Sequence, residues 1–226
     1  MREALMLDFL SQLELHNNRE WFHGNQELYR QAKLAFQQLV GELMDGLGSV
    51  DEAILPMDPA SLTFKLMRDT RFSHDKSSYQ PAFRAHIGPK GKLPIPVGYY
   101  LMIRPGNRSF LGGGLFADMF PGATALVRDS IAAHGEEWEQ IIQAPEFAKL
   151  FSVQGTKLKN VPRGYDPEDP NGEYLKYKSW YVEYPVSDDQ LLQGDFVPGA
   201  LSVFSRMKPL NDFLNRALGG FEMPRR

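Results

Sequence analysis

The stretch VGYYLMIRPGNRSFLGGGLF, residues 97–116, predicts the centre of a β-sheet. Its first half is apolar on both faces, which is typical of a central strand with neighbours on either side. Pro105, Gly106 and Asn107 then supply turn residues before a second apolar run that contains three consecutive glycines. We therefore expect two neighbouring strands joined by a short turn.

Three other segments also have the pattern of strands. In SLTFKLMRD, residues 61–69, Leu62, Phe64 and Leu66 alternate with polar side chains, as in a half-buried strand. PAFRAHIG, residues 81–88, is a further candidate, and KSWYVEYPV, residues 178–186, again alternates apolar and polar positions. Short polar turns link four of the five segments, which favours an antiparallel meander.

Helical periodicity occurs on both sides of these strands. Residues 3–15 predict one helix, and Asn17 with Glu20 has the spacing of a capping box that begins another, with its apolar stripe over residues 28–47. Helical patterns return after Pro121, and a last helix extends to Ala217. The predicted fold class is α+β, with a mainly antiparallel sheet of about five strands packed with N- and C-terminal helices, in a single domain over residues 1–226.

Composition excludes several classes of protein. The 226 residues include no cysteine, so disulfides and thiolate metal sites are excluded. No apolar run is long enough to span a bilayer, and we expect a soluble, cytoplasmic protein without a membrane partner. Glycine-rich phosphate loops and nucleophile elbows are missing, and the five histidines lack metal-ligand spacing. The sequence predicts no metal site, and it identifies no cofactor, catalytic residue or oligomeric state.

Charge is concentrated in the middle of the chain. Between Lys65 and Arg108 there are nine basic residues and two acidic ones, although the whole chain has a net charge of -3. The densest part is RDTRFSHDK, residues 68–76. Guanidinium groups bind phosphate or carboxylate through paired hydrogen bonds, so this segment predicts a binding site for an anionic small molecule. The candidate ligand-binding residues are Arg68, Asp69, Arg71, Ser73, Asp75, Lys76, Tyr79 and Gly113.

Each group of candidates has a stated role. The two arginines and Lys76 supply positive charge, Ser73 and Tyr79 supply hydroxyl donors, and the two aspartates hold the guanidinium groups in place. Gly113 belongs to the run Gly112–Gly114, which forms either an anion-binding nest or a bulge where a strand bends. If the site is catalytic, one of the aspartates is the candidate base.

Two other interpretations remain open. Phe72, Tyr79, Phe83, Tyr99 and Tyr100 lie among the basic residues, and a sheet that carries aromatic and basic side chains can bind nucleic acid or a protein without catalysis. The low isoelectric point, about 6.0, makes nucleic acid the weaker partner. Alternatively, the arginines and aspartates form a purely structural ion-pair network.

Six motifs occur in a fixed order: NNREWF, RDTRFSHDK, GYYLMIRPG, SFLGGGLF, PRGYDPEDP and PLNDFLNRAL. In them the chain resembles the DUF2461 family of uncharacterised bacterial and fungal proteins over residues 5–218. The resemblance singles out Asn18, Trp21, Arg68, Asp69, Arg71, Phe72, Asp75, Lys76, Tyr79 and Gly112 to Gly114. The chain departs from the family pattern at Gln80, where a lysine is usual, and at Asp169-Pro170, where a histidine often intervenes. These two departures favour binding over acid–base chemistry.

Overall fold

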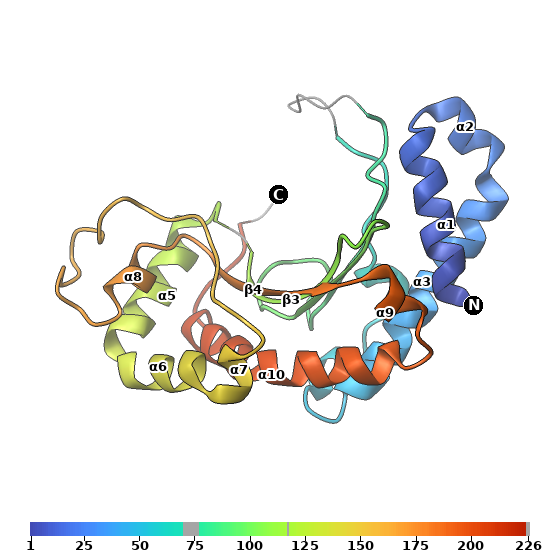
Figure 1. Cartoon of the computed structure of the whole chain (residues 1–226). Coiled ribbons are helices and arrows are strands. Elements are labelled where there is room, and N and C mark those ends of the chain that lie inside the picture. The colour runs from blue at the N-terminus through green and yellow to red at the C-terminus, as the bar shows by residue number, and fades with distance from the viewer. Residues whose placement is uncertain (70–76, 117, 225–226) are drawn as a thin grey trace. The chain divides into compact units, whose positions relative to one another are not determined.

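Four strands form one open antiparallel sheet, in the order β1-β2-β3-β4 (Figure 1). The structure is a computed structural model that describes residues 1–69, 77–116 and 118–224. The strands are β1 (Phe83–Ile87), β2 (Tyr99–Ile103), β3 (Ser109–Leu115) and β4 (Trp180–Val186). This arrangement confirms the predicted fold class and four of the five predicted strands.

Residues 61–69 form no named strand. Asp58 caps a helical turn, α4 (Pro59–Leu62), by accepting a hydrogen bond from the amide of Ala60 at 3.1 Å. Leu62 is therefore the end of a helix, and the chain next makes only isolated antiparallel bridges, at Thr63 with Ala85 and at Met67 with Tyr79. The prediction of a strand over residues 61–69 was wrong because a short helix and a bend at Leu66 divide the segment.

The helices cover most of the remaining chain. In order they are α1 (Arg2–Leu15), α2 (Arg19–Gly24), α3 (Gln26–Leu47), the 3-10 helix η1 (Glu52–Ile54), α5 (Pro121–Ala133), α6 (Gly135–Gln143), α7 (Pro145–Ala148), α8 (Gly172–Leu175), α9 (Asp188–Leu192) and α10 (Phe196–Ala217). None of the helices within the described ranges has both the length and the apolar character that a bilayer-spanning helix requires.

The described chain divides into two compact units. The first comprises Met1–Lys92, Tyr100–Leu111 and Pro185–Ser202, and the second comprises Leu93–Tyr99, Gly112–Tyr184 and Val203–Arg226. Each is described below by itself, and the single domain over residues 1–226 stays a prediction.

The core of the first unit contains a cluster of aromatic rings. Helices α1 and α3 lie side by side (Figure 1), and Phe9 of α1 contacts both Tyr29 and Phe83, with ring centroids 5.6 and 6.0 Å apart. Phe36 of α3 stacks on the same Phe83 at 5.2 Å. The predicted apolar stripe of α3 is buried from Ala32 to Leu47, because its steps of three and four residues place it on one face.

Two neighbouring asparagines have different roles between α1 and α2. Asn18, not Asn17, caps α2, since its side chain accepts a hydrogen bond from the amide of Trp21 at 2.9 Å. The predicted N-cap is therefore wrong by one residue, and the predicted capping box is wrong too, because the third residue of the helix is Trp21 and not Glu20. Asn17 instead reaches Tyr79, where its side-chain amide donates to the backbone carbonyl at 2.8 Å and accepts from the backbone N–H at 2.9 Å.

Helix α10 organises the second unit through two asparagines one turn apart. Asn215 accepts a hydrogen bond from the amide of Val97 at 2.8 Å and donates to its carbonyl at 3.0 Å. The buried side chain of Asn211 donates to the carbonyl of Gly98 at 3.1 Å and accepts from the amide of Gly114 at 2.7 Å. Both residues lie in the motif PLNDFLNRAL, so this motif satisfies backbone groups that would otherwise be buried without partners.

Candidate functional site

The segment RDTRFSHDK is only partly described. Arg71, Ser73, Asp75 and Lys76 of the predicted site lie outside the described residues, as does Phe72. Arg68 and Asp69 precede the gap, and Arg68 pairs with residues that follow it. The amide of Arg68 donates to the carbonyl of Ser78 at 3.0 Å, and its guanidinium donates to Ser77 Oγ at 3.0 Å. Residues 66–68 therefore pair with residues 78–80 to form a short two-stranded stem, and the side chain of Arg68 reaches across this stem to Ser77.

Tyr79 lies at the base of the same stem as a packed residue. It is 2% exposed, and its ring stacks on Phe22 of α2 with centroids 4.1 Å apart and planes 16° from parallel. With both of its backbone groups bonded to Asn17, Tyr79 anchors the stem to the helical part of the first unit.

Gly113 belongs to the second unit, where helix α10 packs so close to its backbone that a side chain would not fit without a shift of Met207. A Cβ at Gly113 would lie 3.0 Å from Met207 Sδ, which is tighter than nearly all real contacts of that kind. At Gly114 φ is +94°, and a Cβ would lie 2.4 Å from the carbonyl oxygen of Trp180. Close approach of backbone and helix thus accounts for Gly113 and Gly114, and the Gly114 amide already donates to Asn211.

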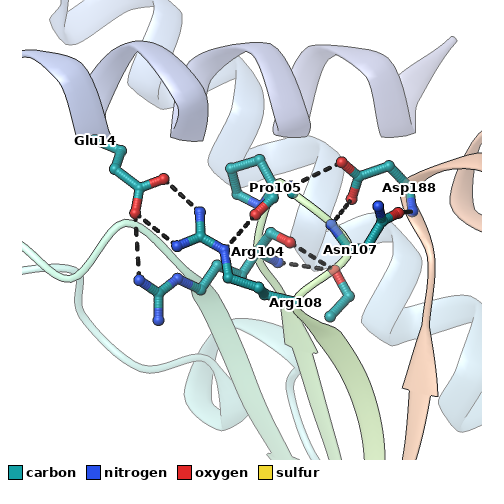
Figure 2. Close-up of polar contacts among 8 residues, drawn as sticks. Glu14, Arg104, Pro105, Asn107, Arg108 and Asp188 are labelled. Atoms are coloured by element: carbon teal, nitrogen blue, oxygen red, sulfur yellow. Dashed lines mark hydrogen bonds and ion pairs between the residues drawn. The ribbon is translucent and has the colours of Figure 1, made fainter.

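The basic residues of the middle segment fall into two groups. Figure 2 shows the first group at the turn between β2 and β3, where Glu14 of α1 binds Arg104 and Arg108. Arg108 contacts both carboxylate oxygens, at 2.9 and 2.5 Å, and Arg104 contacts one at 3.3 Å. The hydrogen bond from Arg108 is the main reason that the pKa of Glu14 lies below its ordinary value.

The same turn is fixed on its other side by Asp188 of α9 (Figure 2). Its carboxylate accepts hydrogen bonds from the amides of Gly106 and Asn107, at 2.8 and 3.1 Å, and its own amide donates to Asn107 Oδ1 at 2.9 Å. Arg104 and Arg108 therefore belong to a structural network of ion pairs and hydrogen bonds. Such a network is one of the interpretations that the sequence allowed for a different segment, residues 68–76.

The second group of cations surrounds one aromatic ring. The guanidinium carbon of Arg84 in β1 lies 5.5 Å from the centroid of Phe64, and Lys92 Nζ lies 6.0 Å from it. Phe64 and Arg84 are neighbours because the amide of Phe64 donates to the carbonyl of Arg84 at 2.9 Å. Cations at such distances from a ring face are attracted to it.

Neither cation is neutralised by a described acid. Within the described ranges, no carboxylate forms an ion pair with Arg84 or Lys92. Their hydrogen bonds go to backbone carbonyls instead, from Arg84 to Lys65 at 3.4 Å and from Lys92 to Thr63 at 3.1 Å. The Nε atom of Arg84 is buried and has no hydrogen-bond partner in the described part of the chain.

Further aromatic rings continue from Phe64. Tyr100 of β2 lies 6.2 Å from Phe64, and Phe110 of β3 lies 5.7 Å from Tyr100 with the two planes only 20° apart. The three rings are half-buried, whereas Tyr79, Phe83 and Tyr99 are buried in the interior. We call Phe64, Arg84, Lys92, Tyr100 and Phe110 the basic–aromatic surface.

Fold and site together define a class: an α+β protein in which one part of an antiparallel sheet presents aromatic rings and cations that lack described acidic partners. The chain belongs to the DUF2461 family of conserved hypothetical proteins, whose family model matches residues 5–213. No curated protein and no solved structure matches it. Family membership names no reaction or ligand, so a function has to be argued from geometry.

Sequence reasoning grouped Arg84 and Lys92 with the other basic residues but did not select them as ligand-binding. The available signal was alternation in β1, where Phe83 and Ala85 point to the core and Arg84 between them does not. The ring of Phe64 could not be placed in the same way, because its segment was interpreted as a regular strand.

Proposed function

We propose that this protein binds a small molecule bearing a phosphate or carboxylate group at the basic–aromatic surface of its first unit. One observation carries the proposal: Arg84 and Lys92 flank the ring of Phe64, and neither forms an ion pair with a described acid. Arg84 is half-buried, and a half-buried cation without a counter-charge is unfavourable, a cost that a bound anion removes.

The two cations suit different parts of such a ligand. Arg84 is half-buried, and its planar guanidinium supports directional hydrogen bonds to an anionic oxygen. Lys92 is exposed and supplies a mobile point charge. Tyr100 and Phe110 offer half-buried ring surface beside them, against which the apolar or planar part of a ligand would pack.

In the segment RDTRFSHDK, the amide of Arg68 pairs with the carbonyl of Ser78 and so joins the two ends of the segment. The proposal does not depend on Arg71, Ser73, Asp75 or Lys76, which lie outside the described residues. We keep the cytoplasm as the proposed compartment, because a chain without cysteine gains nothing from an oxidising one.

A second candidate function is binding of single-stranded nucleic acid. The row of rings from Phe64 through Tyr100 to Phe110 favours it, since successive bases stack on aromatic side chains beside cations. The two functions differ in their response to salt. Affinity for a nucleic-acid backbone falls steeply as salt is added, whereas a small ligand that contacts two cations depends on salt weakly.

The test is a titration of the folded protein with inorganic phosphate, citrate, adenosine monophosphate and a thymidine oligonucleotide. We expect one of the small anions to bind, and we expect Arg84→Gln and Lys92→Gln each to weaken it about tenfold, as for loss of a charged hydrogen bond. Lys90→Gln is the matched control, because Lys90 is an exposed lysine two residues from Lys92 and is not among the described cations over the Phe64 ring.

Three results would contradict the proposal: no small anion binds, Lys90→Gln weakens binding as much as Lys92→Gln, or only the oligonucleotide binds. Circular dichroism of each variant separates loss of the ligand from loss of the fold. The Lys92 substitution is the safer of the two, since its side chain is exposed.

A further inference from the structure

The second unit contains a cavity that is separate from the residues discussed so far. It has a volume of about 450 Å³, which lies within the range of small-molecule sites. The end of α6, helix α7, the chain that follows it and the region of α8 form its walls. The lining residues are Ile142, Phe147, Phe151, Ser152, Val153, Lys157, Pro170, Glu173, Tyr174 and Tyr177.

The walls of this cavity are held in place by packing and hydrogen bonds. Phe147 and Phe151 are 2% and 6% exposed and meet edge to face, with centroids 5.1 Å apart. The hydroxyl of Tyr177 donates to the carbonyl of Val153 at 3.1 Å, and the carbonyl of Tyr174 accepts from Trp180 Nε1 at 3.0 Å. The apolar part of the cavity is therefore preformed.

A lysine lies where the aromatic wall meets solvent. Lys157 Nζ lies 4.5 Å from the ring centroid of Tyr177, and the backbones of these two residues form an antiparallel bridge. Its position thus follows from pairing of the chain around residues 154–158 with residues 176–181.

The charge at this rim is not balanced. Glu173 lies 3.5 Å from Lys157 and also pairs with Lys176, so one carboxylate serves two ammonium groups. The side chains of Lys157 and Glu173 are 44% and 65% exposed, and such surface pairs rearrange at little cost. Lys157 is therefore available to a second carboxylate.

We propose that this cavity is a second ligand site, which takes a small organic acid with an aromatic or aliphatic body. The body packs on Phe147, Phe151 and Tyr174, and the carboxylate forms an ion pair with Lys157. An amine is the wrong ligand, because it would meet two ammonium groups and would compete with both for Glu173. The proposal uses only residues of the second unit and does not rest on the proposed function.

The experiment compares phenylacetate with phenylacetamide, which has the same shape and no charge, by ligand-observed NMR and calorimetry. We expect phenylacetate to bind about tenfold more tightly than phenylacetamide, because only the acid forms a charge-assisted contact. Lys157→Gln should lower the affinity for phenylacetate to that for the amide. Lys159→Gln, an exposed lysine two residues away and outside the cavity lining, should leave it within about twofold.

A second variant tests the cavity itself. Ser152 is an exposed residue of the lining, and Ser152→Trp would fill part of the space, so that neither probe binds while the protein stays folded. The proposal is wrong if neither probe binds the unmodified protein, if acid and amide bind equally, if Lys157→Gln has no effect, or if Ser152→Trp binds both probes unchanged.

Discussion

The side-chain amide of Asn17 forms two hydrogen bonds with Tyr79, one to each of its backbone polar groups, at 2.8 and 2.9 Å. Asn215 has the same relationship with Val97 in the second unit, at 2.8 and 3.0 Å. In each case a carboxamide supplies the donor and the acceptor that a neighbouring strand would have supplied. Each unit thus uses an asparagine to satisfy the N–H and the carbonyl of one residue outside the four named strands.

Replacement of Asn17 by alanine should destabilise the protein by about 1–3 kcal/mol, because a partly buried N–H and a carbonyl lose their partners. The free energy of unfolding is measured by urea denaturation, and hydrogen exchange should show faster exchange of the Tyr79 amide. Asn18→Ala is the matched comparison, since loss of a helix cap costs typically about 1 kcal/mol and leaves the Tyr79 amide protected. Unchanged protection of Tyr79 in Asn17→Ala would show that this contact is not formed.

Replacement of Glu14 by glutamine should lower the free energy of unfolding at neutral pH, because Arg104 and Arg108 lose their shared counter-charge. Solvent screening limits the loss to about 1 kcal/mol or less, since the side chain of Glu14 is 36% exposed. The pKa of Glu14 is lowered in the folded state, so its contribution is complete above the ordinary glutamate pKa of about 4.3 and disappears as pH falls through the folded-state pKa.

The measurement for Glu14 is therefore the difference in unfolding free energy between the two proteins as a function of pH. It should shrink from pH 7 toward about pH 3, and it should also shrink in about 1 M salt. A difference that stays constant with pH would point to lost packing and not to lost charge.

Replacement of Glu183 by glutamine should stabilise the protein at neutral pH. Glu183 of β4 is half-buried, burial raises its pKa, and its carboxylate has no hydrogen-bond or ion-pair partner in the described part of the chain. A raised folded-state pKa means that stability is complete while the carboxyl is protonated and is lost as pH rises through that pKa.

The gain from Glu183→Gln should appear as a rise in Tm of about 1–3 °C at pH 7 that vanishes near pH 4, where the natural carboxyl is itself protonated. Differential scanning calorimetry at the two pH values checks it. A variant that is less stable at pH 7 would mean that the charged form of Glu183 has a partner in the folded protein.

Two glycine-to-alanine substitutions should act in opposite directions. Gly114→Ala places a Cβ 2.4 Å from a backbone oxygen at a positive φ, so we expect a loss of about 2–4 kcal/mol. Gly199→Ala lies in α10 with no atom within 4 Å of the new Cβ, and we expect a gain of about 0.5–1 kcal/mol. Denaturation curves of both variants check the pair, and equal effects would contradict it.

Local patterns predicted most of the fold. The turn at Pro105, Gly106 and Asn107 was recognisable from composition, and both Gly106 and Asn107 have positive φ there. The stripe of α3 was equally clear, because burial on one helix face leaves a regular spacing. Residues 61–69 were misinterpreted because a cap at Asp58 begins a short helix, and a two-residue alternation carries no information about that event.

The candidate site was less predictable because its electrostatics depend on contacts distant in sequence. Arg84 and Arg108 look alike in the sequence, but Glu14, which precedes Arg108 by 94 residues, neutralises only the latter. No local spacing reports such a pairing. The position of Tyr79 shows the same limitation, since its partner Asn17 is 62 residues away.

The use of asparagine to bond the backbones of Tyr79 and Val97 also makes these contacts sensitive to deamidation. Slow hydrolysis turns an asparagine into an aspartate, which has no N–H to donate and would place a negative charge against a peptide carbonyl at Tyr79 or Val97. We therefore expect that, on prolonged heating, a mass increase at either of these two side chains accompanies loss of folded material.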